Sequence, residues 1–322
     1  AKVYIVIIND SGVYYESAFY TYPRTGIQVL NGVDCSPILD GSATGSHGIA
    51  FYNTWTVRGI TFRNFADNGL TGNGSDRTVT VLDCTFHDIG EEAIHRVDGG
   101  SGASTIRRCT FYDIDDAVIF FKASTSPNVI NNLFYNCAGT AIYATGGSAV
   151  AAHNTVDSCC AGGSVPYAIY LPNGTAKYNI VTRNASTTAA MRVGTHTYNN
   201  SYNNTASTVA SLHTNYYQGA GTGDLEVDPL YANGTAAAST DRDYSLQSTS
   251  PCFSPGNSSS YNDDINSPVA TTSTVGRDWA MNGHNVLGVS SNNNHDMGCY
   301  EYRSKVLGVN TVDVDSIMDV DT

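Results

Sequence analysis

A chain of 322 residues with 41% hydrophobic and only 14% charged residues can bury a core, which excludes a disordered protein. Its 29 acidic residues outnumber its 16 Lys and Arg residues, and the formal net charge of −13 excludes nucleic acid and anionic membrane surfaces as expected partners. No stretch reaches the ~20 apolar residues of a membrane-spanning helix, so we expect no membrane insertion.

The first predicted element is a β-strand within AKVYIVIIND. This run is too short to cross a membrane and lacks the basic flank and cleavage site of a signal peptide. Because the chain begins abruptly with a strand, we expect a fragment or a processed form. Abundant Gly, Ser, Thr and Asn residues favour closely spaced turns, and the fold class predicted is all-β.

From residue 26 onward the sequence repeats with a period of about 24 residues. Two alternating apolar runs per repeat, separated by polar turns, are typical of one coil of a β-solenoid, in which each strand pairs with the strand above it. We expect seven coils between residues 26 and 205. The first column of the repeat is Phe62, Phe86, Phe111, Phe134, Val156 and Val181. The second column is Ile49, Leu70, Ile94, Val118, Ile142, Ile169 and Met191.

Turn residues follow the same register as the apolar columns. Two residues before the phenylalanine column, stacked asparagines predict a hydrogen-bonded ladder that satisfies turn amides. This turn column is Cys84, Cys109, Asn132, Asn154 and Asn179. Two residues after the phenylalanine column stand Asn64, Asp88, Asp113, Asn136 and Ser158. Cysteines in matching columns of neighbouring coils favour buried free thiols, while Cys252 and Cys299 are the best candidates for a disulfide.

The NNLFYNC turn and the GTAIYATGG strand resemble the pectate-lyase-like superfamily of parallel β-helices, over roughly residues 26 to 302. The resemblance implies a single-stranded right-handed parallel β-helix with a C-terminal, loop-rich closing segment. We therefore expect the β-helix over residues 1–231 and the closing segment over residues 232–302. Residues 303–322 carry Val-Asp repeats and are expected to form an acidic tail or linker.

Strand alternation predicts which residues face outward, because the position after each buried residue of the second column must point away from the core. These outward residues are expected to be Ala50, Thr71, His95, Ile119, Tyr143, Tyr170 and Arg192. Aromatic rings can stack on sugars and arginine can pair with carboxylates or sulfates. We therefore expect Tyr143, Tyr170, Arg192 and also Tyr52 to bind a polysaccharide; the alternative is scattered surface polarity.

Acidic residues precede the same strands on successive coils. Stacked carboxylates repel one another unless a cation, a shared proton or full solvent exposure relieves the repulsion. Ca²⁺ is accordingly the expected cofactor, with Asp67, Glu91, Glu92 and Asp115 as its ligands, and no organic cofactor is expected. The alternative is that these acids only accept hydrogen bonds from turn amides.

Basic residues complete a candidate catalytic cluster of Lys122, His95, Arg96, Asp115 and Asp116. Strict alternation would bury Arg96, but we expect the strand to end at His95 or the neighbouring acids to hold Arg96 near the groove. A Lys or His base could remove the proton next to a uronate carboxylate while an arginine or a cation neutralises that carboxylate. The leading hypothesis is therefore a polysaccharide lyase that acts on an acidic glycan by β-elimination.

Two other functions stay open, as does a purely structural surface coil with no ligand. The first is a non-catalytic glycan-binding adhesin or viral tail-spike, and the second is a glycoside hydrolase with paired carboxylates. DDAVIFFK resembles the Asp-Asp strand of the polygalacturonases, but Thr140 stands where those enzymes carry a catalytic histidine. We expect an extracellular, cell-surface or virion-surface protein, monomeric as an enzyme or homotrimeric as a tail-spike.

Overall fold

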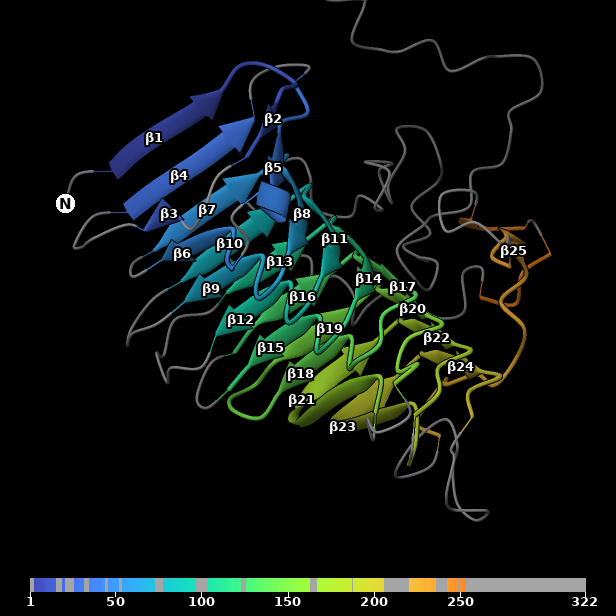
Figure 1. Ribbon diagram of the computed structural model, residues 1–322. Helices are drawn as coiled ribbons and strands as arrows, with labels where there is room; N and C mark the ends of the chain where they lie inside the picture. The colour runs from blue at the N-terminus through green and yellow to red at the C-terminus, as the bar shows by residue number, and fades with distance from the viewer. Residues whose placement is uncertain are drawn as a thin grey trace, which may run out of the picture.

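The computed structural model describes residues 3–15, 19–20, 26–31, 35–43, 46–51, 54–72, 78–96, 104–122, 126–162, 167–186, 188–205, 220–235, 242–247 and 249–252. Within these ranges the chain winds as a parallel β-solenoid, with strands of successive coils side by side (Figure 1). This confirms the predicted fold class. No helix in the described ranges is both long and apolar enough to cross a membrane.

Each coil has three strands, one on each of three walls. The second wall was not predicted as a separate wall, because its strands, such as β7 (Trp55–Arg58) and β10 (Val79–Leu82), end only two residues before strands of the third wall begin. The first wall is β3 (Phe19–Tyr20), β6 (Ile49–Phe51), β9 (Leu70–Gly72), β12 (Ile94–Arg96), β15 (Ile119–Phe121), β18 (Ile142–Ala144) and the first parts of β21 (Ile169–Lys177) and β23 (Met191–Thr197).

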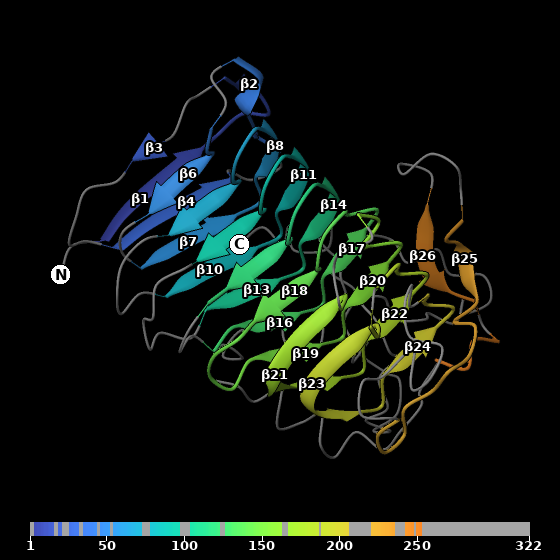
Figure 2. The ribbon, with the colours of Figure 1, turned by 60° about the horizontal axis from the view of Figure 1, so that its bottom comes forward.

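The other two walls follow the same stacking (Figure 2). The second wall is β1 (Val3–Ile8), β4 (Gly26–Asn31), β7 (Trp55–Arg58), β10 (Val79–Leu82), β13 (Thr105–Arg107), β16 (Asn128–Ile130), β19 (Val150–Ala152) and the later parts of β21 and β23. The third wall is β2 (Val13–Tyr14), β5 (Ile38–Asp40), β8 (Thr61–Phe65), β11 (Thr85–Ile89), β14 (Thr110–Ile114), β17 (Leu133–Tyr135), β20 (Thr155–Asp157), β22 (Ile180–Thr182) and β24 (Asn200–Tyr202). A 3-10 turn, η1 (Gly41–Ala43), follows β5.

The phenylalanine column fills the interior behind the third wall, as predicted. Phe62, Phe86, Phe111 and Phe134 are fully buried and stack with ring centroids 4.8, 5.1 and 4.8 Å apart. Like side chains recur at strand spacing because the parallel register pairs equivalent residues of successive coils. The interior is therefore a continuous stack and not a set of separate clusters.

The second column is confirmed except at one coil. Ile94 pairs with Ile119 and Ile119 with Ile142, so Ile119 and not Val118 belongs to the column. Val118 and Ile119 are both fully buried, and the turn before them shifts the register by one residue relative to the expected spacing. The outward residue of this coil is consequently Phe120, and the expectation that Ile119 faces outward was wrong.

The predicted asparagine ladder runs along the turn before the third wall. Asn154 Oδ1 accepts the Asn132 amide at 3.0 Å, and Asn179 Oδ1 accepts the Asn154 amide at 3.0 Å. The predicted turn residues after the phenylalanine column have left-handed backbones, with φ from 52° to 59°, a region that Asn and Asp tolerate better than most residues. The two turn columns therefore keep all coils in one register.

The thiols of the coils are buried and free, as predicted for stacked cysteines. This set comprises Cys84, Cys109, Cys137, Cys159 and Cys160. Cys299 and the acidic tail lie outside the described residues, so the disulfide with Cys252 and the tail stay predictions.

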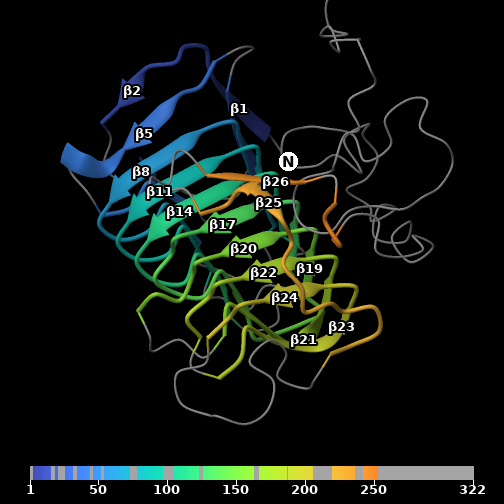
Figure 3. The ribbon, with the colours of Figure 1, turned by 90° about the vertical axis from the view of Figure 1, so that its right-hand side faces the viewer.

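An antiparallel pair of strands, β25 (Tyr231–Asn233) and β26 (Asp243–Leu246), follows the coils. It lies across the third wall, in front of β17 and β20 in Figure 3, and the rings of Tyr244 and Tyr135 are 5.6 Å apart. The predicted boundary between residues 231 and 232 falls inside β25.

Candidate functional site

The outer face of the first wall carries a continuous row of aromatic side chains. The aligned outward residues are Ala50, Thr71, His95, Phe120, Tyr143, Tyr170 and Arg192. We call His95, Phe120, Tyr143 and Tyr170 the aromatic strip. Successive centroids of the strip are 5.3, 4.9 and 5.0 Å apart, and each member is partly exposed.

The rings of the strip lie against one another, so they present their edges to solvent. Phe120 and Tyr143 are within 9° of parallel, and Tyr143 and Tyr170 within 17°. The guanidinium of Arg192 continues the stack, 5.7 Å from the Tyr170 ring centroid. Burial, followed by the nearby Tyr170, raises the pKa of Tyr143, so its hydroxyl stays a hydrogen-bond donor at neutral pH.

Glu92 and His95 form a polar pair at the start of the strip. Glu92 Oε2 lies 3.1 Å from His95 Nδ1 and also accepts a hydrogen bond of 3.2 Å from Asn68 Nδ2. Glu92 and Asn68 are buried, at 8% and 2% exposure. Because His95 Nε2 is buried and has no hydrogen-bond partner among the described residues, His95 is better placed to orient its neighbours than to take a proton from a ligand.

The acidic residues border the strip, but in a different register from the one expected. Three residues before the aligned Leu70, Ile94 and Ile119 stand Asp67, Glu91 and Asp116, which therefore form one column. Asp115 and Glu92 fall outside this column because the true register pairs Ile119 with Ile94. The carboxylates of the border are Asp67, Glu91, Asp115 and Asp116, all at least partly exposed.

The acids make contacts that differ from those of a metal site. Glu91 accepts a hydrogen bond of 2.9 Å from Asn68, Asp116 accepts one from the Ala117 amide at 2.7 Å, and Asp67 lies 3.9 Å from His47. No three Asp, Glu, His or Cys side chains in the described ranges are grouped so that they could hold a metal ion. The donor set as it stands does not fit Ca²⁺, which stays a prediction for these acids.

The two predicted basic catalytic residues lie in different environments. Lys122 is exposed and directly follows β15, where its backbone amide donates to the Arg96 carbonyl at 2.9 Å. Arg96 is 2% exposed inside the solenoid, where its Nη1 donates to Ser104 Oγ at 2.7 Å. The expectation that Arg96 lies near the groove was wrong, because β12 continues through Arg96 and alternation turns the side chain inward.

The structure thus brings together part of the predicted site. His95, Tyr143, Tyr170 and Arg192 share the first wall and Lys122 directly follows β15, while Tyr52 lies outside the described residues. Sequence reasoning missed Phe120 through the one-residue register error. It also missed Asn68, although its position one residue after Asp67 in the acidic turn was visible.

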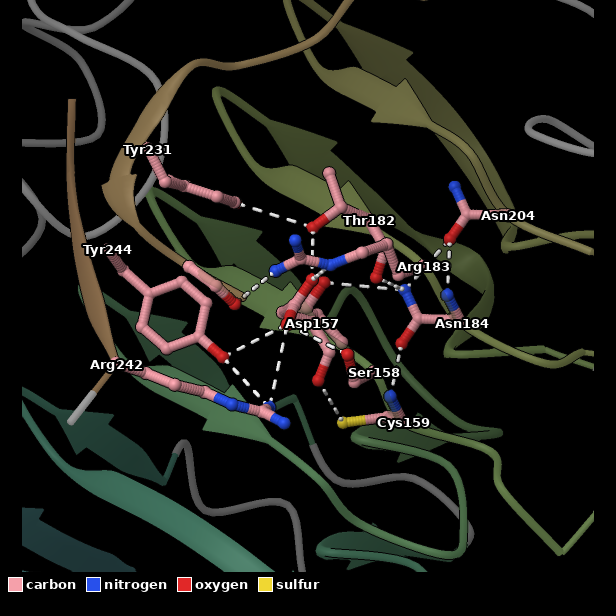
Figure 4. Close-up of polar contacts among 12 residues, drawn as sticks. Asp157, Ser158, Cys159, Thr182, Arg183, Asn184, Asn204, Tyr231, Arg242 and Tyr244 are labelled. Atoms are coloured by element: carbon pink, nitrogen blue, oxygen red, sulfur yellow. Dashed lines mark hydrogen bonds and ion pairs between the residues drawn. The ribbon is translucent and has the colours of Figure 1, made fainter. Parts of the chain in front are cut away.

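A second polar cluster surrounds the buried carboxylate of Asp157 on the third wall (Figure 4). Asp157 is completely buried and accepts hydrogen bonds from Thr182 Oγ1 at 2.6 Å, Arg183 Nε at 2.7 Å and Tyr244 OH at 2.9 Å. Arg183 Nη2 also donates to the Gly234 carbonyl at 2.7 Å. The cluster connects the β25–β26 strands to the coils, so we assign it a structural role.

Comparison with known proteins agrees with this architecture. No curated protein sequence matches the chain. A family model described as a right-handed beta helix region matches residues 47–210, just over half of the 322 residues, and this region contains the strands from β6 to β24. The parallel walls, the stacked phenylalanines and this match together show that the chain belongs to the right-handed beta helix family.

Proposed function

We propose that the outer face of the first wall binds a polysaccharide along the aromatic strip. The observation that carries the proposal is the continuous row of ring contacts from His95 to Arg192, which spans five successive coils; His95 meets Phe120 edge to face, and Phe120, Tyr143 and Tyr170 are stacked. Such a row repeats the same contact along the solenoid axis, which suits a ligand that is itself a linear repeat. The right-handed β-helix fold is compatible with carbohydrate-active proteins.

The contacts expected of the strip follow from its ring orientation. Because the ring faces of Phe120 and Tyr143 are covered by their neighbours, sugars would meet ring edges and the hydroxyls of Tyr143 and Tyr170. A phenol hydroxyl both donates and accepts, as sugar hydroxyls do. The strip therefore offers hydroxyl groups for hydrogen bonds beside apolar ring edges. Stacking of a pyranose on a ring face, which was expected from the sequence, would be possible only at the two ends of the strip.

The charges around the strip favour a glycan of low charge. Four carboxylates border the strip, whereas among the described residues the exposed or partly exposed cations near it are Arg192 and, just beyond β15, Lys122. A polyanion would meet repulsion from the border and from the net charge of −13. An acidic glycan would bind well only with a divalent cation between it and the acids.

Glycan-array binding tests the proposal. We expect the protein to retain one or more neutral glycans, and the variants Tyr143→Ala and Tyr170→Ala to lose at least tenfold in affinity. Tyr112→Ala, on the outer face of the third wall, is the matched control and should bind as the parent does. Equal binding by all three variants, or no retained glycan, would place the function elsewhere.

β-Elimination of an acidic glycan is a second candidate, and the position of Lys122 favours it. Lys122 is exposed and directly follows β15, so its amine could accept the proton next to a uronate carboxylate, with Arg192 on the first wall to pair with that carboxylate. Incubation with pectate, alginate and glycosaminoglycans, with and without a chelator, should then give absorbance from unsaturated uronyl ends. Lys122→Ala should abolish that signal. If the absorbance of the wild-type reaction rises on none of the substrates, glycan binding without cleavage is the function that is left.

A further inference from the structure

The formal charge of the coils changes sign along the solenoid. From Asp40 to Asp116 the sequence holds 11 acidic residues against six Lys and Arg residues, a net charge of −5. From Ser158 to Gly223 it holds three Lys and Arg residues and no acidic residue, a net charge of +3. The second range contains the strands from β21 to β24, which lie together at one end of the walls (Figure 1). The row of outward side chains on the first wall therefore begins in acidic coils and ends, at Arg192, in basic coils.

The acids that border the aromatic strip stop halfway along it. Asp67, Glu91 and Asp116 form one column in the turns before β9, β12 and β15. The same position of the column is Gly139 before β18 and Thr188 before β23. A ligand along the strip thus lies beside carboxylates at the β12 end and beside uncharged residues at the β23 end.

Arg192 ends the outward row and is held by two aromatic rings. Its guanidinium carbon lies 5.7 Å from the ring centroid of Tyr170 and 5.9 Å from that of Tyr167, and the two rings are stacked 5.3 Å apart. Tyr167 is only 5% exposed and so gives fixed support, whereas Arg192 is partly exposed. A guanidinium stacked on rings keeps its N–H edge for a planar anion. The β23 end of the strip is therefore a preformed place for one carboxylate.

We infer that the strip binds a linear glycan in one direction, with the carboxylate of one uronic acid at Arg192 and uncharged sugars beside the acidic column. This ligand class rests on the glycan binding proposed above. A carboxylate can accept two parallel hydrogen bonds from one guanidinium, which a sugar hydroxyl cannot. The reverse orientation would place that carboxylate beside Asp67, Glu91 or Asp116, where like charges repel.

The distance between the two charged regions sets the spacing of acids along the glycan. Three strand spacings separate β15, the strand next to the last acid of the column, from β23, which is ~14 Å at ~4.8 Å per spacing. A chain with a carboxylate on every sugar would place several of them beside the acidic column. Lys122, which directly follows β15, offsets at most one of the three charges of that column. The expected ligand is therefore a heteroglycan in which uncharged sugars separate the uronic acids.

Calorimetry with several forms of one glycan tests the direction and the class. The neutral probe is a glycan retained on the array, made neutral by carboxyl reduction where it carries acids. The charged probes are the same glycan with one carboxylate, on either its first or its last sugar, and the same glycan with a carboxylate on every sugar. One of the two singly charged forms should bind about tenfold more tightly than the neutral form, because it adds a charge-assisted hydrogen bond. The other singly charged form and the fully charged form should bind more weakly than the neutral form.

Arg192→Gln separates recognition of the carboxylate from a general loss of binding. This variant should bind the neutral form and the favoured singly charged form with equal affinity, with an unchanged circular dichroism spectrum because Arg192 is partly exposed. Arg58→Gln is the matched control, since Arg58 lies on the second wall with a side chain that is 50% exposed. It should keep the preference of the wild type.

The outcomes distinguish this ligand class from glycan binding itself. If the two singly charged forms bind equally, or neither exceeds the neutral form, the direction and the role of the carboxylate are overturned while glycan binding stands. Tightest binding by the fully charged form overturns the class, and a preference that persists in Arg192→Gln overturns the role of Arg192. A protein that retains no glycan on the array overturns the proposed function as well.

Discussion

Tyr244 donates its hydroxyl hydrogen bond to Asp157, 87 residues earlier in the chain, at 2.9 Å and in a fully buried position. This hydrogen bond connects β26 to the third wall. The Asp157 carboxylate also accepts a hydrogen bond from Arg183. Burial, together with the adjacent Asp157, raises the pKa of Tyr244, so the hydroxyl keeps its proton throughout the neutral range. The buried acid Asp157 is thus one of the contacts that hold the closing strands on the third wall.

Removal of this hydroxyl should lower stability. Tyr244→Phe leaves Asp157 with one donor fewer in a buried site, and we expect a loss of about 1.5–3 kcal/mol in unfolding free energy by urea titration. Tyr14→Phe removes the same kind of bond, Tyr14 to Asp10, at an exposed position and should leave the unfolding free energy essentially unchanged. Equal losses of unfolding free energy in the two variants would contradict a special role for the buried hydrogen bond between Tyr244 and Asp157.

The asparagine ladder predicts a larger effect from one polar side chain. Asn154→Ala removes the acceptor of the Asn132 amide and the donor to the Val129 carbonyl, both buried. Because buried groups without partners are costly, we expect a loss of at least about 2 kcal/mol in a urea titration. Asn173→Ala, at an exposed position of β21, is the control; a comparable loss there would show that the ladder adds nothing.

The acid sensitivity of the protein should depend on Asp40. Burial alone would raise the pKa of this carboxyl, but hydrogen bonds from the Ser42 amide, Asn64, the Ser42 hydroxyl and Arg63 outweigh burial and hold the pKa well below its usual range. A lowered folded pKa gives stability that is fully present above the unfolded pKa of about 3.9 and is lost as pH falls through the folded pKa.

Asp40→Asn should therefore be less stable than the wild type at pH 7, and the difference should shrink at acidic pH. Urea midpoints measured at pH 7, 4 and 2.5 give the comparison. A difference between the two proteins that is the same at all three values would contradict the assignment.

Arg96 and Lys122 should respond to substitution in opposite ways. Arg96→Ala leaves a cavity inside the solenoid and should cost at least about 2 kcal/mol of stability, without altering glycan affinity of the folded protein. Lys122→Ala, at an exposed position, should leave stability within about 0.5 kcal/mol while it changes any cleavage. Thermal unfolding measures the stability of the two variants, and the glycan assays measure their binding and cleavage. A loss of glycan affinity in folded Arg96→Ala would contradict the buried, structural role of Arg96.

Much of the fold could be predicted from sequence because equivalent residues of adjacent coils in a parallel solenoid are separated by a nearly constant number of residues. Phe62 and Phe86 meet at 4.8 Å, as their separation of 24 residues predicted. The asparagine ladder and the buried thiols followed from the same columns. Each of these features requires only that equivalent residues of adjacent coils be in contact.

The candidate site could be predicted only in part, because one residue of register reverses the face of a strand. The turn before β15 decided that Phe120 and not Ile119 faces outward, and that Asp116 and not Asp115 aligns with Glu91. Continuation of β12 through Arg96 decided that this arginine is buried.

The sequence by itself determined the winding of the chain, since local repetition and strand alternation suffice for it. Only the tertiary structure decided which side chains share a surface and that Tyr244 reaches Asp157. Those contacts depend on turn geometry and on the return of a distant segment, and neither leaves a periodic signal in the sequence.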